Sequence, residues 1–299
     1  MKTTIVLFYK YVTIENPHEL REREFAVCEV LGLKGRMLIA EEGINATLEG
    51  DDAAIRTYIT HLKKDKRFKN VDFKTSEGNG KAFPRLSIKV KREICASGLP
   101  ATVDPRVKTA RHIPPDELKK MYEKGDDFVI IDMRNTHEYD VGHFRNSIHP
   151  SLTYFRELQE KKDALLPFKD KKVITVCTGG VRCEKASAYL LSLGFNDVSQ
   201  LDGGMHRYME KFPGQDFEGA LYVFDDRVVW QNVPASERTV VGKCAHCAAP
   251  TETFIDCGND RCAAHLLVCD TCMDKYKEGS KVFCSSACRD TALYAQQTA

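Results

Sequence analysis

The chain has 299 residues, of which 42% are hydrophobic, and a formal net charge of +1. This length predicts two or three domains and is ample for a hydrophobic core, and the charge excludes a protein that is a polycation as a whole. The apolar run near the N-terminus, Ile5 to Tyr9, is too short for a signal peptide or a membrane span. We therefore expect a cytoplasmic protein without membrane contact, whose 12 cysteines are reduced, metal-bound or catalytic rather than paired in disulfides.

Residues 1–93 alternate between strand and helix patterns in a way that is typical of a compact α+β domain. An Asn-Pro pair at 16–17 opens the first helix, and Glu41-Glu42-Gly43 separates two strands as a hairpin turn does. The order βαββαβ predicts a ferredoxin-like or acylphosphatase-like fold. The expected strands cover 4–9, 35–40, 44–48 and 86–90, and the expected helices cover 16–31 and 51–64.

The tail of this domain is basic. Between Lys63 and Arg92 there are eleven Lys or Arg side chains and three acidic ones. Such an excess is typical of a surface that binds a phosphate backbone, and it is equally typical of a solvated surface. Phe68 and Phe83 lie among the cations, and we expect both in the core rather than stacked on bases. The cations considered as nucleic-acid contacts are Lys63, Lys64, Lys66, Arg67, Arg85 and Lys89.

Three further regions follow the basic tail. Residues 94–115 carry several prolines and little periodicity, and we interpret them as an interdomain linker. In residues 116–214 strand and helix patterns alternate, which predicts a parallel α/β sheet. Its first helix is expected from Asp116 to Lys124 and its first strand from Phe128 to Asp132. Residues 215–299 form a third, cysteine-rich segment.

A short loop at 177–182 joins a predicted buried strand at 173–176 to a predicted helix at 186–193. Two glycines in such a turn let successive backbone N–H groups point inward, and the helix adds the positive end of its dipole. A thiolate at Cys177 would lie at the centre, so we expect its pKa to fall from about 8.5 into the range of roughly 3.5–7.5. Arg182 adds a fixed positive charge. The candidate catalytic residues are Cys177, Thr178, Gly179, Gly180 and Arg182.

This loop resembles the active-site loop of rhodanese domains, whose cysteine carries a persulfide. Four residues separate Cys177 from Arg182, as in rhodaneses, whereas related phosphatases have five, so the count argues against a phosphate substrate. The upstream residues are similar to the rhodanese D-x-R…E…GH signature, and the downstream residues resemble the turn before the last helix of that domain. These segments are Asp132-Met133-Arg134, Glu138, Gly142-His143-Phe144 and Leu201-Asp202-Gly203-Gly204.

Four residues near the loop have supporting roles in this interpretation. We expect Asp132 and Arg134 to pair and brace the loop, which is a role that we favour over contact between Arg134 and an anion. Cys183 is expected to pack in the core rather than to act as a resolving thiol. We consider His143 only as a neighbour of the site, because a histidine in this context more often has a structural role.

The C-terminal segment holds eight of the twelve cysteines, in four short-spaced pairs. Two tetrahedral zinc sites of four thiolates each require such pairs. The pairs combine either in sequence or interleaved, the first with the third and the second with the fourth. Zinc held by four thiolates has no open position for water, so we expect a structural metal that supplies much of this segment's folding energy. The alternative is eight metal-free thiols. The expected ligands are Cys244, Cys247, Cys257, Cys262, Cys269, Cys272, Cys284 and Cys288.

Taken together, these parts are similar to one family along nearly the whole chain, the rhodanese-containing tRNA uridine hydroxylases. The resemblance rests on the acylphosphatase-like start, CTGGVRCEKA at 177–186, FDDR at 224–227 and the cysteine-rich end, and residues 36–45 resemble the family's N-terminal signature. It implies dioxygen-dependent formation of 5-hydroxyuridine at the wobble position (U34) of tRNA, with Cys177 as the essential residue. Ala46 stands where glycine is expected, and the linker fits the family pattern poorly, but neither departure touches the cysteine loop.

The sequence leaves the electron source open, because it contains no flavin or nicotinamide fingerprint and no two-His-one-carboxylate iron motif. One hypothesis has Cys177, as thiolate or persulfide, add to C6 of uracil, and another has a peroxy or sulfenic form of Cys177 deliver oxygen. Two other classes of function are alternatives. One is a sulfurtransferase that uses a Cys177 persulfide, and the other is a non-catalytic adaptor that binds RNA or protein, which the intact loop disfavours.

Overall fold

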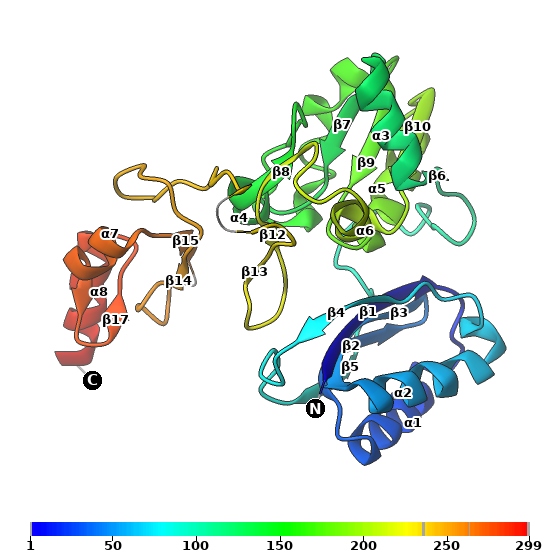
Figure 1. Cartoon of the computed structure of the whole chain (residues 1–299), viewed down its shortest axis with the longest axis horizontal. Coiled ribbons are helices and arrows are strands. Elements are labelled where there is room, and N and C mark those ends of the chain that lie inside the picture. Colours follow the sequence, from blue (N-terminus) through cyan, green and yellow to red (C-terminus); the bar gives the residue numbers. More distant parts are fainter. Residues whose placement is uncertain (1, 235–236, 263, 298–299) are drawn as a thin grey trace.

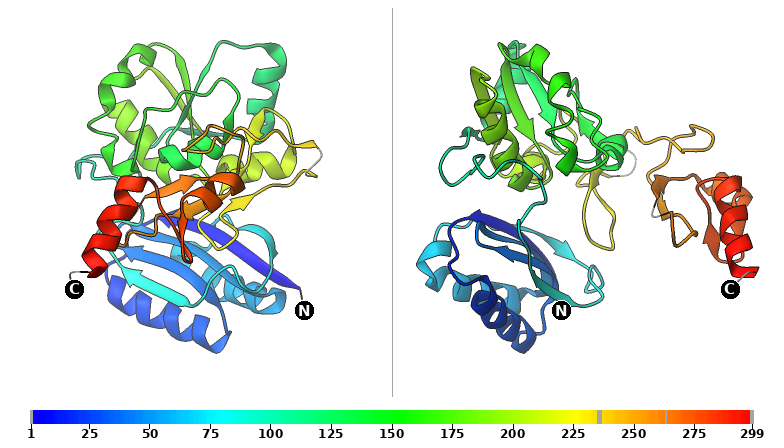
Figure 2. Two further views of the ribbon diagram at one scale, coloured as in Figure 1. Left: turned by 90° about the vertical axis from the view of Figure 1, so that its left-hand side faces the viewer. Right: turned by 180° about the vertical axis from the view of Figure 1, so that it is seen from behind.

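The computed structural model describes residues 2–234, 237–262 and 264–297. Three parts follow one another along the chain (Figure 1). The N-terminal α+β domain and the central α/β domain face each other, and the cysteine-rich segment extends from one side of the central domain (Figures 1 and 2). This architecture confirms the fold class expected from the sequence. Among the described residues, no helix is both long and apolar enough to cross a membrane.

The N-terminal domain is a five-stranded sheet in the order β4-β1-β3-β2-β5, with both of its helices on one face. Neighbouring strands are antiparallel except for the parallel pair of β2 and β5. The edge strand β4 was not expected, because its sequence, KTSEG, has no apolar alternation. The elements are β1 (Thr3–Tyr11), α1 (Pro17–Val30), β2 (Lys34–Ala40), β3 (Gly43–Asp51), α2 (Asp52–Lys64), η1 (Lys66–Phe68), β4 (Lys74–Gly78) and β5 (Leu86–Val90).

The two faces of this sheet serve different purposes. Val6 and Phe8 of β1 are buried in a core that includes residues of both helices. The residues between and after them, Leu7 and Tyr9, point to the opposite face because successive side chains of a strand alternate. That second face meets the central domain, so its side chains line the space between the two domains.

The central domain contains a parallel sheet in the order β6-β10-β9-β7. Strand β6 lies within the predicted linker, so the last residues of that segment belong to the sheet. Both faces are covered, since Val173 of β9 packs in one apolar core and Ile174 and Val176 pack in another. The elements are β6 (Arg111–Ile113), α3 (Pro115–Lys124), β7 (Val129–Asp132), α4 (Thr136–Val141), β8 (Gly142–Phe144), η2 (Phe155–Glu157), η3 (Lys162–Ala164), η4 (Leu166–Phe168), β9 (Lys172–Val176), α5 (Val181–Ser192), β10 (Asp197–Leu201), α6 (Gly204–Lys211) and β11 (Phe217–Gly219).

The cysteine-rich segment is built from short hairpins and two helices around small clusters of cysteine and apolar side chains. It contacts the central domain through His137 of α4, whose ring packs edge-on against Tyr222, Phe254 and His265. The elements are β12 (Leu221–Tyr222), β13 (Val229–Trp230), β14 (Phe254–Asp256), β15 (His265–Leu267), α7 (Asp270–Lys275), β16 (Lys277–Glu278), β17 (Lys281–Val282) and α8 (Ser286–Gln297).

Candidate functional site

Cys177 follows β9 directly and lies at the carboxyl end of the parallel sheet, the edge at which open α/β sheets place their active sites. The first residues of α6 form hydrogen bonds with the backbone of its loop. The backbone N–H groups of Met205 and His206 donate to the carbonyl oxygens of Cys177 and Thr178, at 2.9 and 3.1 Å. Gly204 is required at this contact, because a Cβ there would lie 2.6 Å from the Cys177 carbonyl oxygen.

The thiol of Cys177 is fully buried and surrounded by donors. The backbone N–H of Gly180, a residue with a φ of +107°, donates to Cys177 Sγ at 3.2 Å. Burial by itself raises the pKa of Cys177, but the hydrogen bond with the Cys183 thiol, the charge of Arg182 and the Gly180 N–H outweigh it and lower the pKa to about 6. Helix α5 begins at Val181, five residues earlier than expected, so its first turn adjoins the thiolate.

Arg182 does not project freely into the site. It forms a two-pronged ion pair with Glu138 of α4, with Nη2 2.7 Å from Oε2, and Nη2 also donates to Thr178 Oγ1 at 3.2 Å. Burial raises the pKa of the Glu138 carboxyl, but the charges and hydrogen bonds around it, chiefly those of Arg182, together lower the pKa by more. Glu138 therefore positions Arg182 beside the loop, which is a role that we did not assign to this carboxylate from the sequence, although it lies in the upstream signature.

Asp132 and Arg134 lie behind the loop rather than in it. Both side chains are fully buried and paired, with Arg134 Nη2 2.7 Å from Asp132 Oδ2. The same Nη2 donates to the Gly142 carbonyl oxygen at 2.6 Å. His143 stacks on Tyr139 and, like this ion pair, is absent from the described residues that line the cavity above Cys177. The pair thus braces the strand end instead of contacting an anion.

A cavity of about 530 Å³ lies between the Cys177 loop and the open face of the N-terminal sheet. Two glycines allow this close approach. A Cβ at Gly179 would lie 2.7 Å from Leu7 Cδ2, and one at Gly180 would lie 2.7 Å from the Tyr9 hydroxyl oxygen. The lining includes Leu7, Tyr9, Arg36, Leu38, Asn45, Thr47, Phe83, Cys95, Asn135, Tyr154, Arg156, Cys177, Thr178, Gly179, Arg182 and Phe224.

The sequence analysis missed the aromatic and cationic residues at the rim of this cavity. Tyr154 and Phe224 are each 46% exposed, and Arg36 and Arg156 are exposed too. The guanidinium of Arg156 lies 4.6 Å from the centre of the Tyr154 ring. Arg36 and Phe224 lie in segments that resemble family motifs, whereas no local signal distinguishes Arg156. Aromatic rings and guanidinium groups are the side chains that stack on unpaired RNA bases.

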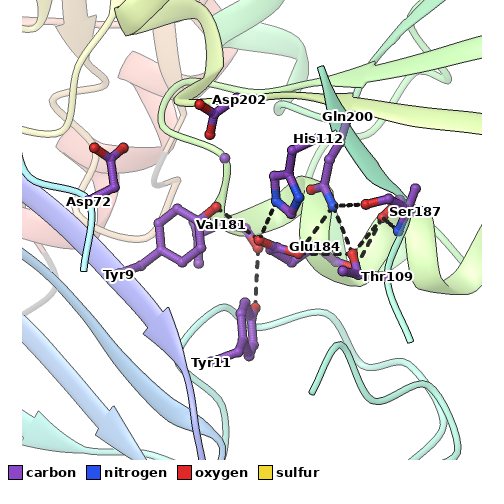
Figure 3. Close-up of polar contacts among 12 residues, drawn as sticks. Tyr9, Tyr11, Asp72, Thr109, His112, Val181, Glu184, Ser187, Gln200 and Asp202 are labelled. Carbon is purple, nitrogen blue, oxygen red and sulfur yellow. Dashed lines mark hydrogen bonds and ion pairs between the residues drawn. The ribbon is translucent and has the colours of Figure 1, made fainter. Parts of the chain in front are cut away.

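The N-terminal domain is fastened to the first turn of α5. The hydroxyl of Tyr11 donates to the Val181 carbonyl oxygen at 3.2 Å, and the hydroxyl of Tyr9 donates to Glu184 at 3.2 Å. Figure 3 shows Glu184 at the centre of a polar cluster that also includes His112, at 2.9 Å. These contacts connect the helix that follows Cys177 to the sheet that forms the opposite cavity wall.

The structure divides the six basic residues considered as nucleic-acid contacts between two places. One group lies at the end of α2 and in η1, before the edge strand β4, and the other lies immediately before and within β5, the opposite edge strand. In the first group Arg67 is held by Asp65, with Nη2 2.6 Å from Oδ2. The groups are Lys63, Lys64, Lys66 and Arg67, and Arg85 and Lys89.

The eight cysteines of the C-terminal segment form two interleaved clusters, in each of which all four sulfur atoms lie within 4.8 Å of one another. Around the second cluster, the Cys284 backbone N–H donates to Cys257 Sγ at 3.4 Å, and Asn259 Nδ2 donates to Cys288 Sγ at 3.3 Å. Four converging thiols with such donors are suited to a tetrahedral metal ion. The first cluster is Cys244, Cys247, Cys269 and Cys272, and the second is Cys257, Cys262, Cys284 and Cys288.

The fold and the loop define a protein built around a rhodanese domain. Family models match in three places, the UPF0176 acylphosphatase like domain over residues 3–94, the rhodanese-like domain over 114–211 and the rhodanase C-terminal region over 218–289. A solved rhodanese-like domain protein from Staphylococcus aureus is 30% identical and covers 33% of this chain and 90% of its own, with a TM-score of 0.29.

Similarity also extends over nearly the whole chain. Proteins named tRNA uridine(34) hydroxylase from Staphylococcus aureus strains MSSA476 and MRSA252 are each 40% identical to it, over 99% of this chain and 93% of theirs. The chain therefore belongs to the tRNA uridine(34) hydroxylase family, which confirms the resemblance seen in the sequence.

Proposed function

We propose that this protein hydroxylates the wobble uridine of tRNA to 5-hydroxyuridine, with dioxygen as co-substrate and Cys177 as the essential residue. The observation that carries the proposal is an acidic thiol on the floor of a cavity of about 530 Å³ whose rim is aromatic and cationic. A cavity of this size accommodates one nucleoside, and the rim provides surfaces for stacking and for phosphate. As an enzyme acting on tRNA it works in the cytoplasm.

The chemistry assigned to Cys177 follows from its environment. As a thiolate it is a nucleophile that adds to C6 of uracil, which makes C5 electron-rich toward an oxidant. The donors around its sulfur, including the Gly180 N–H, stabilise the negative charge when the thiolate is released again. Overall, one oxygen atom of dioxygen enters the C5–H bond and the other becomes water, with two electrons from an external donor and two protons from solvent.

We further propose that the two cysteine clusters each hold a structural zinc ion. The support is the convergence of four thiols in each cluster and the donors directed at Cys257 and Cys288. All four positions of each tetrahedron are filled by the protein, so these ions would have no open site for catalysis. Their role would be to hold together a segment with little apolar core.

The tRNA contact is proposed at the cavity rim, where Arg36 and Arg156 lie beside Tyr154 and Phe224. These cations would meet the phosphates that flank the extruded wobble nucleotide. The basic groups at the end of α2 and next to β5, represented by Lys64 and Arg85, would add sequence-independent attraction for the rest of the tRNA.

The test is nucleoside mass spectrometry on unmodified tRNA incubated with the protein and a reductant, with and without dioxygen. We expect an oxygen-dependent gain of one oxygen atom on the wobble uridine that is lost in Cys177→Ser. Cys28→Ala, which changes a buried cysteine of α1 outside the cavity, is the matched control and should retain activity. Hydroxylation by Cys177→Ser would refute the role of the thiol. A persulfide on Cys177 without any hydroxylation would favour a sulfurtransferase.

A further inference from the structure

The cavity wall opposite Cys177 is an ordered array of side chains from three adjacent strands. The register of β2, β3 and β1 aligns Leu38, Asn45 and Tyr9 in one row across the sheet. Arg36, Thr47 and Leu7 form the next row, and all six residues line the cavity. Asn45 is at the centre of its row, directly beside the tyrosine that touches the cysteine loop at Gly180.

The amide of Asn45 is fixed in one orientation. Its Nδ2 donates to the Ile94 carbonyl oxygen at 3.0 Å. Rotating the amide by 180° would place Oδ1 against that carbonyl, so two acceptors would repel each other. In the described part of the chain Oδ1 has no hydrogen-bond partner, and it is therefore a free acceptor on a residue that lines the cavity.

The other amide in the cavity is already occupied. Asn135 Oδ1 accepts the Phe155 N–H at 3.0 Å, and the same residue caps α4. Arg36 and Arg156 offer only donors, and Thr47 carries a hydroxyl that is free to rotate. The Oδ1 of Asn45 is thus a hydrogen-bond acceptor in the cavity whose orientation is fixed by the fold.

We propose that Asn45 determines the specificity for uracil, with Oδ1 accepting the N3–H of the target base. This inference rests on the proposed function. In a uracil ring N3–H lies opposite C6, so a ring with C6 within reach of Cys177 holds N3–H on its far edge, where the strand residues that line the cavity can meet it. Cytosine has a lone pair at N3 instead of a hydrogen, and the fixed Oδ1 would face a second acceptor. The pocket would then reject cytosine, because a buried unpaired acceptor is unfavourable.

The experiment measures binding, so that it does not depend on turnover. Two anticodon stem-loops that differ only in U34 or C34 are titrated into Cys177→Ser and into Cys177→Ser/Asn45→Ala. We expect the first protein to prefer the U34 stem-loop by about 10-fold to 100-fold, and the second to bind both with a ratio near one. The matched control is Asn196→Ala in the same background, since Asn196 is an exposed asparagine whose Nδ2 donates to Asp170 at 2.8 Å. It should keep the preference.

Two outcomes would overturn the proposal. One is equal binding of the U34 and C34 stem-loops by Cys177→Ser, the protein in which Asn45 is still present. The other is an undiminished preference in the Asn45→Ala protein. Alkylation of Cys177 by iodoacetamide at an unchanged rate in the single variant Asn45→Ala verifies that the loop is intact. Failure of hydroxylation in the unmodified protein would count against the proposed function alone, because the binding preference is measured separately.

Discussion

At the scale of single residues, two opposing effects set the pKa of Cys177. Burial disfavours a thiolate, whereas the thiol of Cys183, the guanidinium of Arg182 and the N–H of Gly180 favour it. The donors prevail, with a net lowering of the pKa. The same hydrogen bond acts in reverse on Cys183, because burial and the neighbouring Cys177 raise the pKa of Cys183 well above its ordinary value. Cys177 is therefore the more acidic thiol of the pair.

This arrangement predicts the effect of Cys183→Ala on reactivity. In the unmodified protein, alkylation of Cys177 by iodoacetamide should accelerate as the pH rises, with a midpoint near 6, because the thiolate forms as the pH passes the pKa. Removing the Cys183 thiol should move the midpoint upward by about one unit. Mass spectrometry of the Cys177 peptide gives the rate at each pH, and Cys177→Ala identifies the signal. Coincident midpoints in the two proteins would contradict the assigned role of Cys183.

At the scale of elements, the C-terminal segment depends on its sulfur clusters. Its hairpins have two residues per strand in β16 and β17, and its apolar clusters are small and contain the cysteines themselves. Interleaving matters here, because each cluster joins pairs that are far apart in sequence. Cys244 and Cys272 belong to one cluster, and Cys257 and Cys288 belong to the other, so a metal ion bound in either cluster would close a long loop.

We predict two zinc ions per chain and loss of structure in this segment when they are removed. Zinc binding to four thiolates contributes about 10–16 kcal/mol in small domains. After chelation, limited proteolysis should cleave within 244–288 while the two preceding domains resist. Metal analysis and the proteolytic pattern, before and after readdition of zinc, provide the measurement. A metal-free protein that resists proteases equally would show that the thiols need no metal.

At the scale of the whole molecule, the cavity exists because two domains are fastened around it. Besides the contacts of Tyr9 and Tyr11, the ammonium of Lys185 in α5 lies 2.9 Å from Glu42, in the turn between β2 and β3, and 2.7 Å from Glu93, just before the linker. Its side chain is 4% exposed. Burial raises the pKa of Glu93, but hydrogen bonds from Lys185 and Ser97 lower it by more.

Lys185→Met should therefore destabilise the protein by about 3–5 kcal/mol, because two carboxylates lose a buried partner. The difference from the unmodified protein should shrink as the pH falls below about 4, since a carboxylate with a lowered pKa stabilises above its unfolded pKa and ceases to do so once protonated. Thermal unfolding at several pH values measures this. The control is Lys171→Met, whose partner Asp127 is 80% exposed and which should cost about 0–1 kcal/mol. Equal effects of the two substitutions would contradict the role of Lys185 in holding the two domains together.

Much of the fold and part of the site were predictable because their signals are local. The glycines and the spacing of the Cys177 loop encode a strand, a tight turn and a helix within a few residues. Strand β4 and strand β6 were missed, since both are short and polar and acquire strand structure only by pairing with a neighbour. The earlier start of α5 was also missed. Its first N–H groups donate to the carbonyl oxygen of Gly180, a contact that the apolar pattern of the sequence does not reveal.

The sequence by itself determined the candidate nucleophile, the three-part architecture and the identity of the eight clustered cysteines, because these depend on residue type and on spacing along the chain. Only the tertiary structure decided that the clusters interleave, that Glu138 holds Arg182, and that the N-terminal sheet closes over Cys177. It also brought Asn45 and Arg156 to the same cavity from different domains. Such residues carry no local signal, since their positions follow from which faces pack against each other.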